Sequence, residues 1–228
     1  MPYLILILVL LLALYGPQLW ASYTFKRYAK ERSDIPGSGG ELARHLLDRF
    51  EMAHIKVERG NTGEDHYDPV AKTVRLGPDN FDGHSLTGIA VAAHEVGHAI
   101  QDHRGETLLG LRARLLGIAN RFQKLGTAAV LLLPVIMLLS RSPALGGILL
   151  LLGIASMFIT TLVHLVTLPV ELDASFGKAL PILQQGEYVK AKDEMAVRRI
   201  LRAAAWTYVA ASLASLLNVW RWLSVFRR

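Results

Sequence analysis

No cysteine occurs among the 228 residues of the chain. A disulfide framework is therefore excluded, and any metal site has to use histidine and carboxylate side chains instead of thiolates. Charge is also scarce, because charged residues make up 19% of the chain and hydrophobic residues 52%. A soluble domain needs a larger charged surface facing water, so this balance favours a membrane protein.

The formal net charge of +6 could on its own indicate a nucleic-acid partner. The Lys and Arg residues are spread along the chain, however, and no recognisable nucleic-acid-binding module accompanies them. We therefore expect no nucleic-acid partner and take the lipid bilayer as the partner that explains the charge. No pattern in the sequence sets an oligomeric state.

Four apolar blocks approach the length that a helix needs to cross a bilayer, about 20 residues. The first block could instead be a cleaved signal peptide, but it lacks a basic segment in front and a clean small-residue cleavage site behind. We predict a membrane anchor at residues 1–22, a pair of spans at residues 124–168 and a last span at residues 203–222.

The two segments between the spans, residues 36–123 and 169–202, are expected to face water. Together with the flanks of the spans they hold 21 of the 25 Lys and Arg residues and every Asp and Glu. Basic residues beside spans are retained in the cytoplasm. We therefore predict a multi-pass protein of the cell membrane, with both water-exposed segments in the cytoplasm and both termini outside.

Apolar residues at helical spacing predict a helix over residues 41–52, with Ser38 available as its cap. Residues 55–58 and 73–76 alternate apolar with polar side chains and predict a short β-hairpin. Residues 85–101 predict a second helix, which follows a turn. The expected fold class is mainly α, a polytopic membrane protein with about four transmembrane helices and a small cytoplasmic α+β domain.

This second helix carries the run His94-Glu95-Val96-Gly97-His98. Positions four apart lie on one helix face, so both imidazoles can bind a single zinc ion. Zinc acidifies bound water, and Glu95 can take that water's proton as it attacks a peptide carbonyl. Gly97 leaves room for another element to approach. The pattern also arises by chance, but two His and a Glu are costly to bury in an apolar helix without a shared partner.

A zinc site needs a third protein ligand. In the long form of the motif a Gly and a third His follow, but Gln101 and Arg104 occupy those positions here. Asp102 lies on the same stripe as the two histidines, yet it is about 11 Å along the axis from His94, too far to complete a tetrahedron. We interpret Asp102 as a supporting or solvated residue.

Glu171 is the remaining candidate for the third ligand. It follows the third apolar block and Pro169, and a carboxylate at the end of a buried span is costly unless it has a partner. The alternative is an ordinary interfacial acid that pairs with Lys178. Asp173 could brace a ligand histidine or simply cap the following helix.

Three further residues are weaker candidates. His66 and Tyr67 can stabilise an oxyanion, although residues in a predicted turn are more often ordinary surface residues. His164, inside the third span, can face the site or bond a neighbouring helix. Residues 73–76 either offer an open strand edge to an extended substrate or form a buried strand.

Three segments carry a resemblance to a known family: Asp65-His66-Tyr67-Asp68-Pro69, Ala92-Ala93-His94-Glu95-Val96-Gly97-His98-Ala99-Ile100-Gln101 and Pro169-Val170-Glu171-Leu172-Asp173-Ala174-Ser175. With them the chain resembles, over nearly its whole length, the YugP-type membrane neutral zinc metallopeptidases. The resemblance implies a zinc-dependent membrane peptidase with one Zn²⁺ per chain. It further implies that His94, His98 and Glu171 are the ligands and that Glu95 is the base.

A weaker likeness connects the chain to the heat-shock and prenyl-protein membrane metalloproteases. Together the two resemblances imply a zincin-like catalytic segment over residues 36–123. In the heat-shock and prenyl-protein proteases an Asp follows the ligand Glu by four residues. This sequence has Ser175 there and Asp173 earlier. The departure leaves the ligand assignment intact but weakens the supporting role of Asp173.

The sequence therefore predicts a membrane-bound zinc endopeptidase that cleaves membrane or membrane-proximal proteins and peptides. One alternative is an intramembrane protease with its metal inside the bilayer, but the apolar part of the motif helix is short and has polar flanks. Another is a non-catalytic membrane scaffold or chaperone that keeps a structural zinc. A scaffold would not need Glu95, because this residue is not required as a zinc ligand, so its presence in the motif counts against that alternative.

Overall fold

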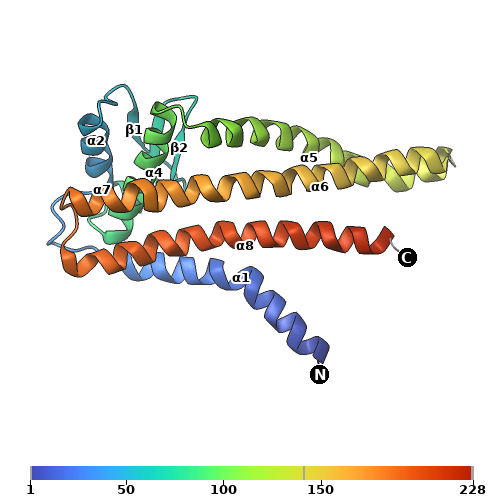
Figure 1. Cartoon of the computed structure of the whole chain (residues 1–228), viewed down its shortest axis with the longest axis horizontal. Helices are drawn as coiled ribbons and strands as arrows, with labels where there is room; N and C mark the ends of the chain where they lie inside the picture. Colours follow the sequence, from blue (N-terminus) through green and yellow to red (C-terminus); the bar gives the residue numbers. More distant parts are fainter. Residues whose placement is uncertain (1, 141, 227–228) are drawn as a thin grey trace.

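The computed structural model describes residues 2–140 and 142–226. Long helices extend from one end of the molecule, where the shorter helices and the strands form a compact layer (Figure 1). The long helices are α1 (Pro2–Tyr28), α5 (Thr107–Ser140), α6 (Pro143–Leu172) and α8 (Glu194–Phe226). The shorter helices are α2 (Gly39–Arg49), α3 (Pro78–Phe81), α4 (Leu86–His103), α7 (Leu180–Gln185) and η2 (Ala191–Asp193).

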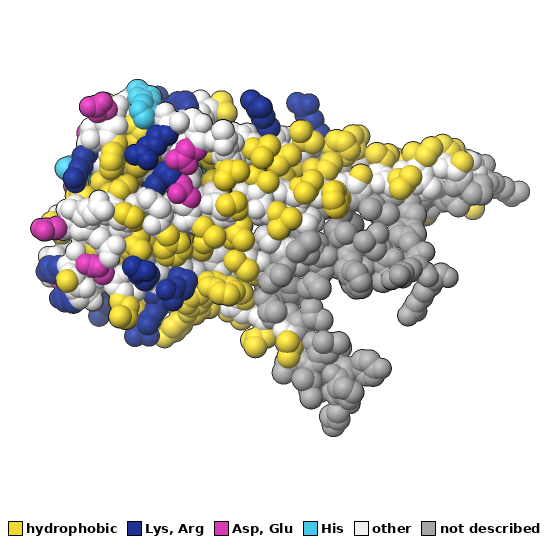
Figure 2. Space-filling model, viewed as in Figure 1, with side chains coloured by type: hydrophobic (Ala, Val, Ile, Leu, Met, Phe, Trp, Pro, Cys, Tyr) yellow, Lys and Arg dark blue, Asp and Glu magenta, His cyan; other side chains and the backbone are white. Residues whose placement is uncertain are grey.

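The long helices contain the apolar blocks of the sequence. Figure 2 shows hydrophobic side chains along them, whereas charged side chains gather mainly on the compact layer. Among the described residues, one helix, Ala144–Gln185, is long and apolar enough to cross a membrane. The fold is thus mainly helical with a small sheet, as predicted, while the count of about four spans is not confirmed.

The helix Ala144–Gln185 combines three elements in one continuous course. α6 passes into a π-helical segment, η1 (Asp173–Ala179), and then into α7. Because the chain does not turn at the end of the apolar part, Glu171 and the residues after it enter the compact layer and pack against α4. Contacts between η1 and α4 are extensive.

α2 begins with a capping box. The Ser38 hydroxyl accepts a hydrogen bond from the Glu41 amide at 3.3 Å, and the Glu41 carboxylate accepts one from the Ser38 amide at 2.8 Å. The predicted helix and its cap are confirmed, although the helix ends at Arg49 instead of residue 52. Glu51 adopts a left-handed conformation, φ 60°, which is a common way to end a helix.

The sheet has three strands, β1 (Lys56–Arg59), β2 (His66–Asp68) and β3 (Thr73–Leu76), in the order β1-β3-β2. The predicted hairpin between residues 55–58 and 73–76 is wrong, because β1 and β3 pair in parallel. The sequence prediction missed β2, which forms the antiparallel hairpin with β3. As the central strand, β3 is paired on both sides and cannot offer the open edge considered for it.

α4 is the central helix of the layer. Its first turn is capped by the Ser85 hydroxyl, which accepts from the Gly88 amide at 3.0 Å. Buried alanines on α4, Ala92 and Ala93 among them, let neighbouring elements pack closely. The side chains of α4 join those of α2, β3 and α7 in one apolar core, which fixes the helix that carries the histidine motif.

Candidate metal centre

Three side chains from α4 and the end of α6 converge: His94, His98 and Glu171. Their donor atoms lie within 4.8 Å of one another. The Nε2 atoms of His94 and His98 are 3.2 and 3.3 Å from Oε2 of Glu171. Tetrahedral zinc with ligand bonds of about 2.0–2.1 Å separates its donor atoms by about 3.3 Å. Two imidazoles and one carboxylate, spaced in this way, fit a zinc ion.

Gln101 fixes the orientation of the His98 ring. The Gln101 amide nitrogen donates to the Val170 carbonyl at 2.9 Å and to the Asp173 carboxylate at 2.8 Å. The Oε1 atom of Gln101 lies 2.9 Å from Nδ1 of His98 and, as an amide oxygen, can only accept a hydrogen bond. Nδ1 of His98 therefore carries the proton, and Nε2 presents its lone pair toward Glu171. Hydrogen bonds of this kind hold metal-binding histidines in one tautomer and orientation.

His94 is oriented by Ser175. The Ser175 hydroxyl lies 3.0 Å from Nδ1 of His94, which leaves Nε2 of this ring facing Glu171. Ser175 follows Glu171 by four positions, and both side chains contact histidines of α4. Ser175 stands where the heat-shock and prenyl-protein proteases have Asp, so in this chain a hydroxyl group contacts the histidine ring from that position. Asp173 does not contact either ring directly and acts on His98 through Gln101.

Gly97 allows the close approach of η1 to α4. A Cβ atom at this position would lie 2.8 Å from the carbonyl oxygen of Ala174, a distance shorter than folded proteins tolerate. The prediction that Gly97 admits another element is therefore confirmed. The element is the segment that follows Glu171 and contains Ser175.

We expect Gly97→Ala to lower zinc affinity by roughly tenfold to a hundredfold, the range found when the supports of metal ligands are disturbed. The added methyl group pushes η1 away from α4 and shifts Glu171 from the two histidines. Equilibrium competition with a zinc chelator measures the change. Gly110→Ala is the matched control, because nothing lies within 4 Å of a Cβ there. Affinities that agree among native chain, variant and control would contradict the prediction.

Glu95 lies beside the three converging side chains and is 6% exposed. Burial raises the pKa of its carboxyl group to about 7, and the negative charge of Glu171 adds to the rise. The main-chain amide of Tyr67 on β2 also interacts with this carboxylate. A carboxyl group that titrates near neutral pH can both accept and return a proton there.

The structure adds two residues that the sequence did not reveal. Arg112, in the second turn of α5, has Nη1 2.9 Å from Oε1 of Glu171. The hydroxyl group of Tyr208 on α8 interacts with the same carboxylate. A basic residue or a tyrosine near the end of an apolar helix is common at membrane surfaces, so neither pattern marks a site. Both contacts place Glu171 where α4, α5, α6 and α8 meet.

His66 and Tyr67 lie on β2 and not in the predicted turn. Tyr67 is buried, and its hydroxyl donates to the Asp102 carboxylate at 2.6 Å. Burial and this hydrogen bond raise the pKa of the Tyr67 hydroxyl. Only the main-chain amide of Tyr67 reaches Glu95, while His66 pairs across the sheet with Arg75.

His164 lies two turns before Glu171 on α6, about 10 Å along the axis. It is partly buried, and its main-chain carbonyl accepts a hydrogen bond from the Ser212 hydroxyl at 3.4 Å. Among the described residues, the group that could hold a metal consists of His94, His98 and Glu171 without His164.

Comparisons with known proteins agree with the resemblance seen in the motifs. A family model described as "Putative neutral zinc metallopeptidase" matches residues 3–227. The "Putative membrane protease YugP" of Bacillus subtilis (strain 168) is 36% identical over 227 residues, which cover 97% of this chain and 96% of that protein. No solved structure matches the chain.

Proposed function

The chain belongs to the "Putative neutral zinc metallopeptidase" family, and on that premise we propose that it is a membrane-bound zinc endopeptidase. His94, His98 and Glu171 hold one zinc ion, and Glu95 acts as the general base. The observation that carries the proposal is the spacing of 3.2 and 3.3 Å between the histidine nitrogens and one oxygen of Glu171.

A bound zinc ion supplies the Lewis acidity that polarises a peptide carbonyl and acidifies water. Glu95 accepts the proton of the attacking water and passes it to the leaving nitrogen. Gln101 and Ser175 hold the two imidazole rings in place. Arg112 forms an ion pair with Oε1 of Glu171, and Oε2 of this carboxylate faces the histidines.

We place the substrates among membrane proteins and their membrane-proximal segments. Glu171 follows directly on an apolar helix, and Arg112 and Tyr208 lie on two other long helices. If these helices span the bilayer, the metal lies at its cytoplasmic surface. Four spans, with residues 36–123 and 169–202 in the cytoplasm, are therefore part of the proposal.

We assign the binding of an extended substrate to β2 instead of β3. β2 is at the edge of the sheet, and the Tyr67 amide on this strand contacts the Glu95 carboxylate. A peptide that adds to the outer edge of β2 would be held by main-chain hydrogen bonds, which require little sequence preference. Its backbone would run past Glu95.

The proposed activity can be tested in cells that carry either the native chain or Glu95→Gln. The two membrane proteomes are compared for new N-termini, which mark cleaved peptide bonds. We expect a set of N-termini in membrane or membrane-proximal proteins that occurs with the native chain alone. Identical sets from both cell lines, with both proteins present at equal levels, would refute the proposed peptidase.

The proposed topology makes a separate prediction. A reporter fused in the turn at residues 140–143 is expected to report an external location, and one inserted near Gly39 a cytoplasmic location. The reason is the concentration of basic residues in the segments flanking the apolar blocks. The reverse readings would overturn the orientation and move the substrates to the other side of the membrane.

A further inference from the structure

A basic cavity lies where α1 ends and α8 begins. It has a volume of about 420 Å³. Figure 2 shows Lys and Arg side chains gathered over the start of α8, next to hydrophobic surface. Asp193 is the one carboxylate among the residues that line the cavity, whereas five lining residues are cations: Arg27, Lys30, Arg32, Lys192 and Arg199.

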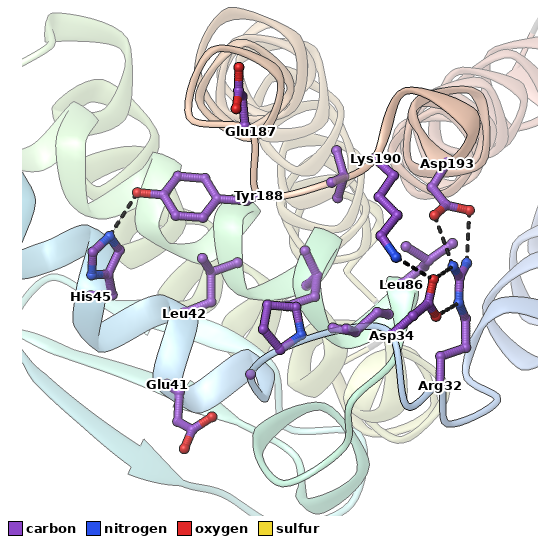
Figure 3. Close-up of a pocket in the computed structure, with 15 residues that line it drawn as sticks. Arg32, Asp34, Glu41, Leu42, His45, Leu86, Glu187, Tyr188, Lys190 and Asp193 are labelled. Atoms are coloured by element: carbon purple, nitrogen blue, oxygen red, sulfur yellow. Dashed lines mark hydrogen bonds and ion pairs between the residues drawn. The ribbon is translucent and has the colours of Figure 1, made fainter.

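An ion-pair network forms one wall of this basic cavity. Figure 3 shows Arg32 held between Asp34 and Asp193, with Lys190 on Asp34. The same network borders the neighbouring cavity of about 530 Å³ drawn in Figure 3. It ties the segment after α1 to the start of α8, so the wall is braced and the charge of Arg32 is balanced.

Three of the five cations that line the basic cavity carry unbalanced charge, whereas Lys192 lies 3.6 Å from Asp34. The guanidinium groups of Arg27 and Arg199 contact the hydroxyls of Tyr23 and Tyr28, at 3.5 and 3.3 Å, and not a carboxylate. Lys30 has no ion pair with another described residue. Arg27 and Arg199 lie on α1 and α8, next to the apolar parts of these helices, and Lys30 follows the end of α1.

An apolar groove of about 610 Å³ continues along the same two helices. Its walls include Leu12, Pro17 and Trp20 of α1 and Trp206 and Val209 of α8. In Figure 1 the N-terminal half of α1 bends away from α8, as expected for a proline inside a helix. The groove lies at this divergence.

The basic cavity and the apolar groove lie on one face of the helix pair. Arg27 follows Trp20 by seven positions, and Trp206 follows Arg199 by seven positions. Two helical turns bring residues back to the same face at a distance of about 10 Å along the axis. Polar and apolar parts therefore follow each other along the α1–α8 seam at the scale of one lipid molecule.

We propose that the α1–α8 seam binds an anionic phospholipid, with its phosphate in the basic cavity and an acyl chain in the apolar groove. A free phosphate ion would use only the cavity and leave the aligned groove without a role. A zwitterionic lipid would add a positive charge to a cavity that already has an excess of it. The proposal rests on the proposed placement of α1 and α8 in the bilayer, but not on the peptidase activity.

A lipid at this site would also hold the helix that carries the histidine motif. Leu86 of α4 lines the basic cavity, and the Thr87 hydroxyl donates to the carbonyl of Phe25 on α1 at 3.0 Å. The end of α1 thus packs on the first turn of α4. A lipid that joins α1 to α8 stabilises this contact.

Fluorescence quenching tests the site in the full-length chain reconstituted in lipid nanodiscs. The chain contains four tryptophans, and Trp220→Phe with Trp222→Phe leaves Trp20 and Trp206 as the reporters. Phosphatidylglycerol or phosphatidylcholine brominated on its acyl chains is added at equal content. We expect the quenching to show a preference for phosphatidylglycerol on the order of a hundredfold, since each of the three unbalanced cations near the anionic surface contributes about fivefold.

The variant Arg27→Gln with Arg199→Gln is expected to reduce the preference by about twenty-five-fold, because it removes two of the three unbalanced cations. Lys26→Gln with Arg198→Gln removes the same charge from exposed neighbours that do not line the cavity, and this control is expected to keep the preference. Loss of preference in the control as well would refute a specific site in favour of general attraction to a basic surface.

Three other outcomes would overturn the proposal for different reasons. Equal quenching by both lipids in the chain that carries only the two Trp→Phe changes would show that the site does not select anionic lipids. Displacement of phosphatidylglycerol by millimolar inorganic phosphate would indicate a free-anion site. Quenching by neither lipid would show that α1 and α8 lie outside the bilayer. None of these readings needs zinc or proteolysis, so a failure here is distinguishable from a failure of the proposed peptidase.

Discussion

Glu171→Gln is expected to lower zinc affinity by more than about a hundredfold and to abolish proteolysis. Changes that merely disturb the supports of metal ligands cost roughly tenfold to a hundredfold, and the loss of a ligand should cost more. The substitution keeps the size of a side chain that is 1% exposed and removes its charge. Chelator competition on the purified chain gives the zinc affinity.

Asp173→Asn is the matched control for Glu171→Gln. Its carboxylate acts on His98 only through Gln101, so we expect a smaller loss of zinc affinity. Glu171→Gln also removes the anionic partner of Arg112, and thermal unfolding of the variant has to show that the chain still folds. Zinc affinity near the native value in a folded Glu171→Gln chain would place the third ligand elsewhere, with Asp173 the next residue to examine.

Glu95→Gln is expected to lower kcat by roughly a hundredfold to ten-thousandfold, the contribution of a positioned acid or base. Zinc affinity should stay within a few-fold of the native value, because Glu95 is not among the three converging side chains. Glutamine keeps the shape of the Glu95 side chain and removes its charge. Zinc content and turnover are measured on the same preparation.

Glu31→Gln provides the control for Glu95→Gln. Glu31 is an exposed carboxylate in the segment after α1, and its loss should change neither zinc content nor turnover. Native turnover in Glu95→Gln would remove the proposed base. A parallel loss of zinc and activity would instead make Glu95 a metal ligand.

The local features of the centre were predictable from sequence because they depend on spacing within one helix. His94 and His98 lie four residues apart, so a helix places both on one face. Glu171 was identified by another kind of reasoning, since a carboxylate at the end of an apolar block is costly without a partner. The structure brings these three candidate ligands together.

The partners of the ligands were not predictable, because they depend on how two distant segments meet. Gln101 reaches Asp173 across 72 positions of sequence, and Ser175 reaches His94 across 81. The alignment of α4 with η1 sets these contacts, and it depends on the fit of Gly97 against the Ala174 carbonyl. A spacing within one helix shows which residues share a face but does not show what that face touches.

The sheet was mispredicted for a related reason. Strands of four residues show the same alternation of side chains in parallel and antiparallel pairs, so the pattern of β1 and β3 did not reveal their direction. β2 has only three residues, and the turn-forming residues beside it masked its strand character. The error matters for function, because β2 is the edge strand that contacts Glu95.

Zinc-dependent cleavage by the purified chain tests the central claim most directly. The chain is reconstituted in a bilayer, stripped of metal with a chelator and given an unfolded polypeptide tethered to the same bilayer. We predict no cleavage without zinc and a rise with added zinc that saturates at about one ion per chain. Cleavage that persists after complete removal of the metal, or full zinc binding without any cleavage, would contradict the account.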